Sequence, residues 1–149
     1  MRELERLAPG VYRIAAGEPA GNARDAALDR GWRYVELRGE KIDSKDAFLR
    51  ACKEAFRLPS WFGGNWDALA DSLCDLSWLE PAPGTLVTFT SAGRLADADP
   101  QSFATAIEIF RAACDWWEPR GMRLVVLVGG APRTYRLRRP GQSRNQAPG

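Results

Sequence analysis

The sequence contains no histidine. Without an imidazole the chain has no Ser–His or Cys–His nucleophile pair, and it lacks the side chain that most often ligates metals. An enzyme built from these 149 residues would have to use carboxylates, lysine or tyrosine. We expect a protein that is not an enzyme and that holds no cofactor and no metal.

Cysteine is scarce, and long apolar runs are missing. The three cysteines, Cys52, Cys74 and Cys114, are an odd number without CxxC spacing, which favours reduced, buried thiols over a disulfide framework. No apolar run reaches the roughly 18 residues of a membrane span. The N-terminus has no apolar signal-peptide core. We therefore predict a cytoplasmic protein without a membrane partner.

Positive charge is absent from residues 58–80, which carry four carboxylates and no lysine or arginine. Three of these acids, Asp67, Asp71 and Asp75, are spaced four apart, so they share one side of a helix if Asn65 caps it. Like charges at this spacing cost roughly 0.2–0.5 kcal/mol per pair, and no base in the segment offsets that cost. The pattern indicates an acidic face that binds a positively charged partner.

Aromatic residues stand directly before this face. Trp61 and Phe62 lie in a predicted loop with Gly63 and Gly64, and aromatic side chains beside charge are typical of binding hot spots. A core position is the competing interpretation for Trp61 and Phe62, and for Phe62 it is the favoured one. Trp66 falls on the side of the helix opposite the acids, where we expect it to be buried.

Hydrophobic patterns predict an α/β fold. The predicted strands span 11–14, 32–37, 85–90 and 122–128, and the predicted helices span 24–30, 44–58, 65 onward and 99–117, with a polar connection at 94–99. Apolar strands separated by helices pair in parallel through right-handed crossovers. We predict a domain at 32–130 with a small three-stranded parallel sheet flanked by helices, to which the N-terminal extension at 1–31 can add a β-α unit. Residues 131–149 read as a disordered arginine-rich tail.

Two other uses of the charged residues stay open. Carboxylate hydrolases hold two acids across a cleft, whereas three aspartates on one exposed helix face point the same way, and their spacing is not that of a calcium loop. The tail offers the second use, an adaptor or nucleic-acid-associated protein whose arginines contact phosphates. Five arginines without a fold around them are more often a solubilising tail, so we expect nucleic acid to be the less favoured partner.

The acidic segment resembles the signature of the barstar family, intracellular inhibitors of barnase-type ribonucleases. The matching residues are Leu58-Pro59, Trp61-Phe62, Gly63, Asn65, Asp67-Ala68-Leu69 and Asp71. The likeness extends from about Trp32 to Val128 and implies the same parallel α/β fold. It also implies that the helix enters the active site of a ribonuclease, with Asp71 where the substrate phosphate binds and Asp67 bonded to basic and backbone groups.

The resemblance has two departures at contact positions. Ala70 stands where the family's namesake has a tryptophan, and Ala112 stands where it has a glutamate, with Glu108 and Asp115 about one turn to either side. The sequence therefore predicts a cytoplasmic immunity protein or antitoxin that inhibits a basic secreted ribonuclease or nuclease toxin domain. The predicted partner-binding residues are Trp61, Phe62, Gly63, Asn65, Asp67, Asp71 and Asp75.

Overall fold

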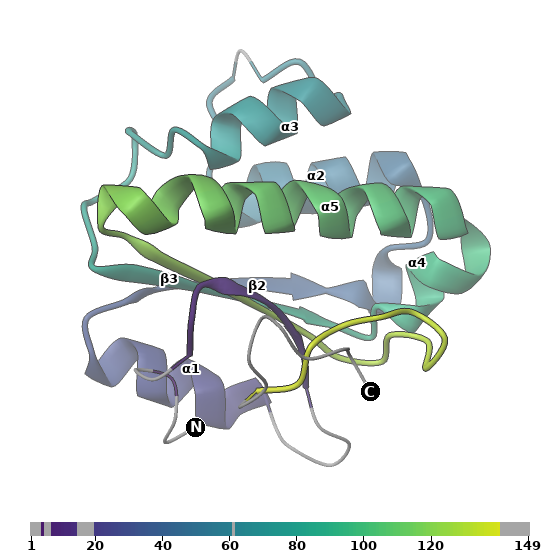
Figure 1. The fold of residues 1–149 in the computed structure, drawn as a ribbon. Helices are drawn as coiled ribbons and strands as arrows, with labels where there is room; N and C mark the ends of the chain where they lie inside the picture. Colours follow the sequence, from purple (N-terminus) through teal and green to yellow (C-terminus); the bar gives the residue numbers. More distant parts are fainter. Residues whose placement is uncertain (1–3, 5–6, 15–19, 61, 141–149) are drawn as a thin grey trace.

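Four parallel strands form one sheet in the order β1-β4-β3-β2 (Figure 1). The computed structural model describes residue 4 and residues 7–14, 20–60 and 62–140. The strands are β1 (Gly10–Arg13), β2 (Arg33–Arg38), β3 (Gly84–Thr90) and β4 (Arg123–Val128). The predicted parallel α/β fold is confirmed, but the sheet has four strands rather than three, because β1 pairs with β4 over its whole length.

Helices cover both faces of the sheet, as Figure 1 shows. The helices are α1 (Ala20–Asp29), α2 (Lys45–Ala55), α3 (Trp66–Leu73), α4 (Gly93–Ala98) and α5 (Pro100–Trp117). The chain crosses the sheet in one direction from β1 to β2 and returns through β3 to β4. Right-handed crossovers therefore place α1 on one face and α2, α3 and α5 on the other.

The sheet separates two hydrophobic clusters. Beneath α1, Tyr12, Ala27, Trp32, Leu86 and Val125 belong to the smaller cluster. The larger cluster lies between the sheet and α2, α3 and α5, and it includes Phe48, Phe89, Phe103, Ile107 and Phe110. Because both faces are covered, β3 and β4 are buried along almost their whole length, and β4 is apolar without alternation.

The segment 94–99, predicted as a polar connection, forms most of a short helix, α4, so that prediction was wrong. Its two buried residues, Leu95 and Ala96, face the core, and the charged residues around them hide this short apolar pair in the sequence. At its end Asp99 caps α5 by accepting a hydrogen bond from the Ser102 amide at 3.1 Å. Proline follows at the first helical position, as the sequence predicts.

Residues 131–140 pack against the domain, whereas the sequence predicted a disordered tail from 131 onward. The Arg13 guanidinium at the end of β1 donates to the carbonyl oxygens of Ala131 at 2.7 Å, Pro132 at 3.0 Å and Tyr135 at 2.7 Å. Leu137 is buried in the larger cluster. These contacts join residues that are far apart in the sequence, so composition does not reveal them. The rest of the predicted tail, 141–149, lies outside the described residues.

The other edge of the sheet is β2. Its charged side chains include Glu36 and Arg38, which pair at 2.9 Å and are both exposed. Arg33 at the start of the strand donates to the hydroxyl of Thr85 on β3 at 3.0 Å. The edge strand therefore carries charge at its beginning, middle and end.

Candidate partner-binding site

The helix α3 begins where the sequence predicts. The side chain of Asn65 accepts a hydrogen bond from the Ala68 amide at 2.8 Å, which satisfies one of the free amides at the helix start. Gly64, the residue before the cap, has a φ of +68°, a conformation that glycine adopts without steric cost. The exposed loop of Gly63 and Gly64 thus turns the chain directly into a capped helix.

Packing on one side fixes the orientation of α3. Leu69 and Leu73 are buried in the larger cluster, and the Trp66 ring lies 5.9 Å from that of Phe48. The indole of Trp117 on α5 donates a hydrogen bond to the Leu73 carbonyl at 2.7 Å, which ties the end of α3 to the end of α5. The opposite side of α3 is therefore presented to solvent in one orientation.

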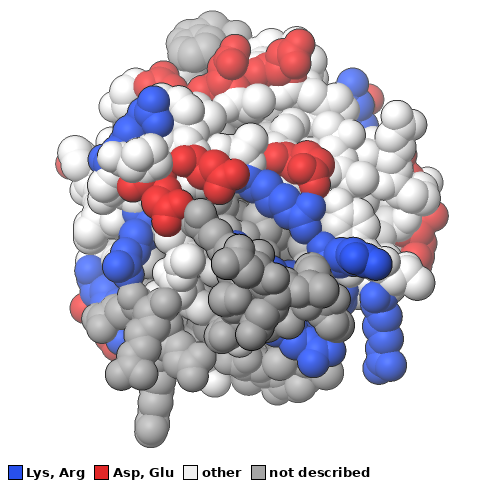
Figure 2. Space-filling view, viewed as in Figure 1, with Lys and Arg blue, Asp and Glu red and all other residues white. Residues whose placement is uncertain are grey.

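The predicted aspartates occupy that solvent side. Asp67 in the first turn and Asp71 one turn later are both exposed, as is Asp75. Within the part of the chain that the structure describes, none of the three carboxylates forms a hydrogen bond or an ion pair. Figure 2 shows acidic side chains along the top of the molecule, where Figure 1 places α3. We call Asp67, Asp71 and Asp75 the acidic face.

Asp75 differs from the prediction in one respect. The helix ends at Leu73, so Asp75 lies in the turn that follows rather than in a third helical turn. Its amide donates to the Ser72 carbonyl at 3.1 Å, and the next residue, Leu76, has a φ of +54° and a buried side chain. Burial of Leu76 pulls the chain out of the helix, which the spacing of the acids alone does not reveal.

Of the two aromatic residues predicted before the helix, Phe62 belongs to the core. Its side chain is 9% exposed and packs in the larger cluster, which agrees with the core position that the sequence also indicated, and its role in partner binding stays a prediction. Trp61 lies outside the described residues. Two adjacent aromatic residues in a loop show no helical or strand periodicity. Periodicity therefore does not indicate which of the two side chains points inward.

The sequence reasoning missed Trp116 on α5. Trp116 is 36% exposed, and within the described residues Trp116 and Leu28 are the two large hydrophobic residues that are exposed rather than partly buried. The buried stripe of α5 ends at Trp117, and a neighbouring residue is rotated by about 100° around a helix. That rotation was the available signal that Trp116 points outward.

The pKa of the Cys74 thiol is sensitive to the charges at the end of α3. Burial raises the pKa of its thiol, the Asp71 carboxylate raises it further, and the Arg120 guanidinium lowers it. Cys74 therefore lies within electrostatic reach of both the acidic face and Arg120. Cys52 and Cys114 are buried, and burial is the main cause of their raised pKa values.

The two departures at contact positions are also visible. Ala70 is partly buried and Ala112 is exposed on α5. Of the acids beside Ala112, Glu108 pairs with Arg111 at 2.5 Å, and Asp115 lines a cavity of about 290 Å³ together with Arg111 and Arg138. Glu108 is thus already paired within the protein, whereas Asp115 faces this cavity beside two arginines.

The geometry fits binding better than catalysis. The acidic face is solvent-exposed, and it lines neither the cavity of about 290 Å³ nor the cavity of about 630 Å³ between β2 and α2. The described residues contain no cluster of three or more His, Cys, Asp or Glu side chains suited to a metal ion. They also contain no helix that is long and apolar enough to cross a membrane.

A small α/β domain that displays exposed carboxylates on a fixed helix has the geometry expected of a protein that binds a cationic surface. The comparison with protein families agrees with this class, since residues 32–129 match the family described as barstar (barnase inhibitor). The match covers well over half of the chain, and the protein belongs to the barstar family. No individual curated protein matches the chain.

Proposed function

We propose that this protein inhibits a basic secreted ribonuclease, or the nuclease domain of a toxin, by placing Asp71 and Asp67 where the enzyme holds substrate phosphates. The observation that carries the proposal is the acidic face: exposed, unpaired carboxylates on a capped and packed helix in a chain of the barstar family. The protein acts in the cytoplasm of the producing cell, as an immunity protein or antitoxin.

Electrostatics supports this mechanism. A ribonuclease site holds its substrate with cations, and hydrogen bonds between ionised partners are roughly twice as strong as neutral ones. Because α3 is already fixed by Asn65, Trp66 and Trp117, little conformational entropy is lost when the carboxylates are bound. Charge complementarity also accelerates encounter, so association should slow as salt is added.

Replacement of Asp71 tests the proposal. Asp71→Asn should weaken inhibition by about 2–5 kcal/mol, because it leaves a desolvated cation of the enzyme without its partner. The same change should stabilise the free inhibitor by about 0.2–0.5 kcal/mol, because it removes like-charge repulsion along α3. Titration of ribonuclease activity gives the first quantity, with barnase and other basic microbial ribonucleases as targets, and urea unfolding gives the second.

The matched control is Asp25→Asn. Asp25 is an exposed helical aspartate on α1, on the opposite face of the sheet from α3, so its replacement should leave inhibition unchanged. Equal inhibition by the Asp71→Asn variant and the parent would show that Asp71 does not take the place of a phosphate. A parent protein that inhibits none of the ribonucleases would overturn the proposed function itself.

The alternative is binding of nucleic acid through the arginines after β4. Arg139 and Arg133 contribute, after burial, to a lowered pKa of Arg13, so positive charge does gather at this end of the sheet. Because residues 131–140 are packed, deleting them would disturb the fold, and substitution is the better test. The double change Arg133→Gln and Arg136→Gln removes two exposed charges and should leave ribonuclease inhibition unchanged. Loss of RNA binding by this variant would instead support the alternative.

A further inference from the structure

Trp116 lies on the same end of the molecule as the acidic face, and no part of the proposed mechanism uses it. The other exposed large hydrophobic side chain among the described residues, Leu28, lies on α1 across the sheet. Removal of a tryptophan ring from water gives a large hydrophobic gain, and exposed tryptophans are enriched among residues that dominate protein interfaces. The surroundings of Trp116 indicate what it binds.

The ring of Trp116 is held in one position. It packs edge to face against Trp117, with ring centroids 4.8 Å apart and an interplanar angle of 85°. The Arg120 guanidinium lies 3.7 Å from the Trp116 ring centroid and also donates to the Trp116 carbonyl. A tryptophan fixed between two neighbours loses little freedom when a partner covers it.

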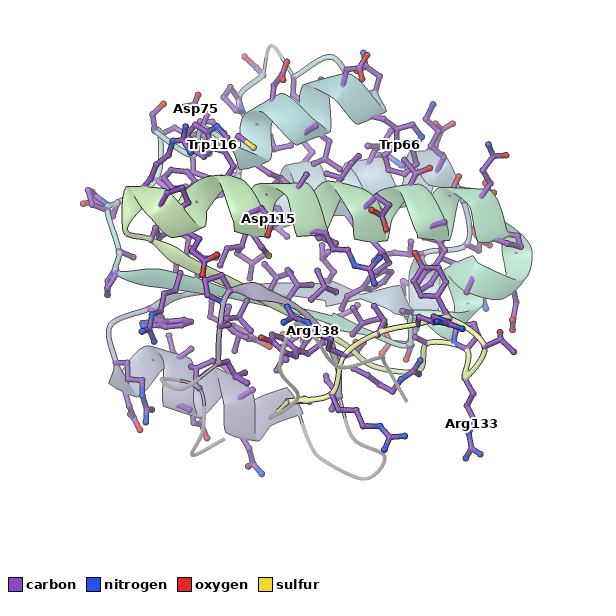
Figure 3. The ribbon with its side chains drawn as sticks, in the orientation of Figure 1. Trp66, Asp75, Asp115, Trp116, Arg133 and Arg138 are labelled. Atoms are coloured by element: carbon purple, nitrogen blue, oxygen red, sulfur yellow. The ribbon has the colours of Figure 1, made fainter. Side chains whose placement is uncertain are left out.

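The pair of Trp116 and Arg120, which we call the Trp116 patch, adjoins the acidic face. Trp117, against which Trp116 packs, is bonded to the Leu73 carbonyl at the end of α3. Asp71 and Arg120 both lie within electrostatic reach of the thiol of Cys74, the next residue: after burial, Asp71 raises its pKa and Arg120 lowers it. In the view of Figure 3, Trp116 and Asp75 are both labelled toward the same end of α3 and α5.

We propose that the Trp116 patch is a second contact with the same nuclease and that it selects among nucleases. This inference rests on the proposed function. The acidic face fits any site that holds phosphates, whereas the patch offers an apolar ring and a guanidinium. Its complement is an apolar surface bordered by a carboxylate, on the rim of the basic groove.

The neighbouring surface is consistent with this role. Ala112, one turn before Trp116, is exposed and small, so a partner can approach the Trp116 ring closely along α5. The Arg120 guanidinium contacts the protein through the Trp116 ring and the Trp116 carbonyl. A guanidinium has five N–H donors, so donors remain for a carboxylate of the partner. Ala112 offers no charge to a partner. The Trp116 patch would instead give α5 an apolar contact and a cationic contact.

Trp116→Ala tests the inference, with Leu28→Ala as the matched control. The targets are barnase and a set of purified basic microbial ribonucleases, and association and dissociation rates are measured at low and high salt. Trp116→Ala should weaken binding at least tenfold through faster dissociation, with an unchanged salt dependence of association, because apolar contacts act after encounter. Leu28→Ala should bind as the parent does.

A second variant and a second readout protect the test against misfolding. Trp116→Phe keeps an apolar ring over Trp117 and should retain part of the affinity, and thermal unfolding verifies that each variant is folded. Alkylation of Cys74 should be slowed by the bound ribonuclease in the parent, because Cys74 follows Leu73, whose carbonyl is bonded to Trp117 beside the Trp116 patch. The same protection should require more ribonuclease in Trp116→Ala.

The outcomes separate the inference from the proposed function. If Trp116→Ala is folded and dissociates like the parent while Asp71→Asn binds weakly, the Trp116 patch is not a contact and the proposed function stands. If neither variant binds differently from the parent, or if the parent binds none of the ribonucleases, both the inference and the proposed function are overturned.

Discussion

At the scale of single residues, the buried thiol of Cys114 links stability to pH. Burial raises its pKa to about 12, from an ordinary value of 9.0. The folded protein therefore keeps this proton at pH values where the unfolded chain has lost it. The contribution to stability is fully present below about pH 9 and is lost as the pH rises toward about 12.

Cys114→Ala should remove this part of the pH dependence. In the parent, this thiol should lower the free energy of unfolding by up to about 1.4 kcal/mol per pH unit above its ordinary pKa. Urea unfolding at several pH values between about 7 and 10 measures the slope for the parent and for the variant. Parallel curves for the two proteins would mean that Cys114 titrates alike in the folded and unfolded states.

The sequence predicts single side chains well where a helix supplies the geometry. The capping role of Asn65 follows from the residue preference at helix starts. The shared exposure of Asp67 and Asp71 follows from their spacing of four. The orientations of Phe62 and Trp116 do not follow from such a local rule. The orientation of Phe62 is decided by distant core residues, and that of Trp116 by where the buried stripe of α5 ends.

At the scale of elements, Arg13 connects the beginning of the chain to its end. The side chain lies at the end of β1 and donates to three carbonyl oxygens in the segment after β4. The Arg13 amide also donates to the Arg138 carbonyl at 2.7 Å. This segment thereby borders the outer side of β1 and occupies the space at the carboxyl end of that strand.

Arg13→Ala should release the segment 131–140 and lower the free energy of unfolding by about 1–3 kcal/mol, because buried carbonyls lose a charged donor. Hydrogen exchange of the Tyr135 amide, which donates to Pro132 at 3.0 Å, should accelerate before global unfolding. Arg24→Ala, which removes an exposed arginine from α1, is the control. Unchanged exchange at Tyr135 in Arg13→Ala would mean that other contacts hold the segment.

Element prediction failed where short segments depend on distant partners. The long, strongly patterned helices α2 and α5 and the apolar strands β3 and β4 can be located from periodicity alone. By contrast, the helix α4 depends on two buried residues, and the segment 131–140 depends on an arginine more than a hundred positions earlier. No local pattern encodes such a contact.

At the scale of the whole molecule, the unit formed by β1 and α1 completes the fold outside the residues that match the family model. β1 pairs with β4, and α1 covers Leu86, Val125 and Leu127 on the second face of the sheet. The family match begins only at residue 32. A fragment limited to the matched residues would leave one edge of β4 unpaired and that apolar face in water.

The fragment 32–129 should therefore associate or unfold where the full chain does not. Exposed apolar patches and unpaired strand edges both favour aggregation. Sedimentation and binding of an apolar dye measure the difference, and the fragment 7–140, which retains β1 and the packed segment after β4, is the control. A fragment 32–129 that stays monodisperse and binds no more dye than the full chain would contradict this view of the added unit.

The charged outer strand β2 opposes pairing of this sheet edge with a second copy of the protein. A second copy that added its own β2 to this edge would bring its charged side chains against Arg33, Glu36 and Arg38. Charged side chains on edge strands discourage such pairing in natural sheets. A protein with the inhibitory role proposed above would have to reach a concentration above that of its target without forming filaments. The strand farthest from β1 in the sheet thus favours a protein that does not polymerise at high concentration.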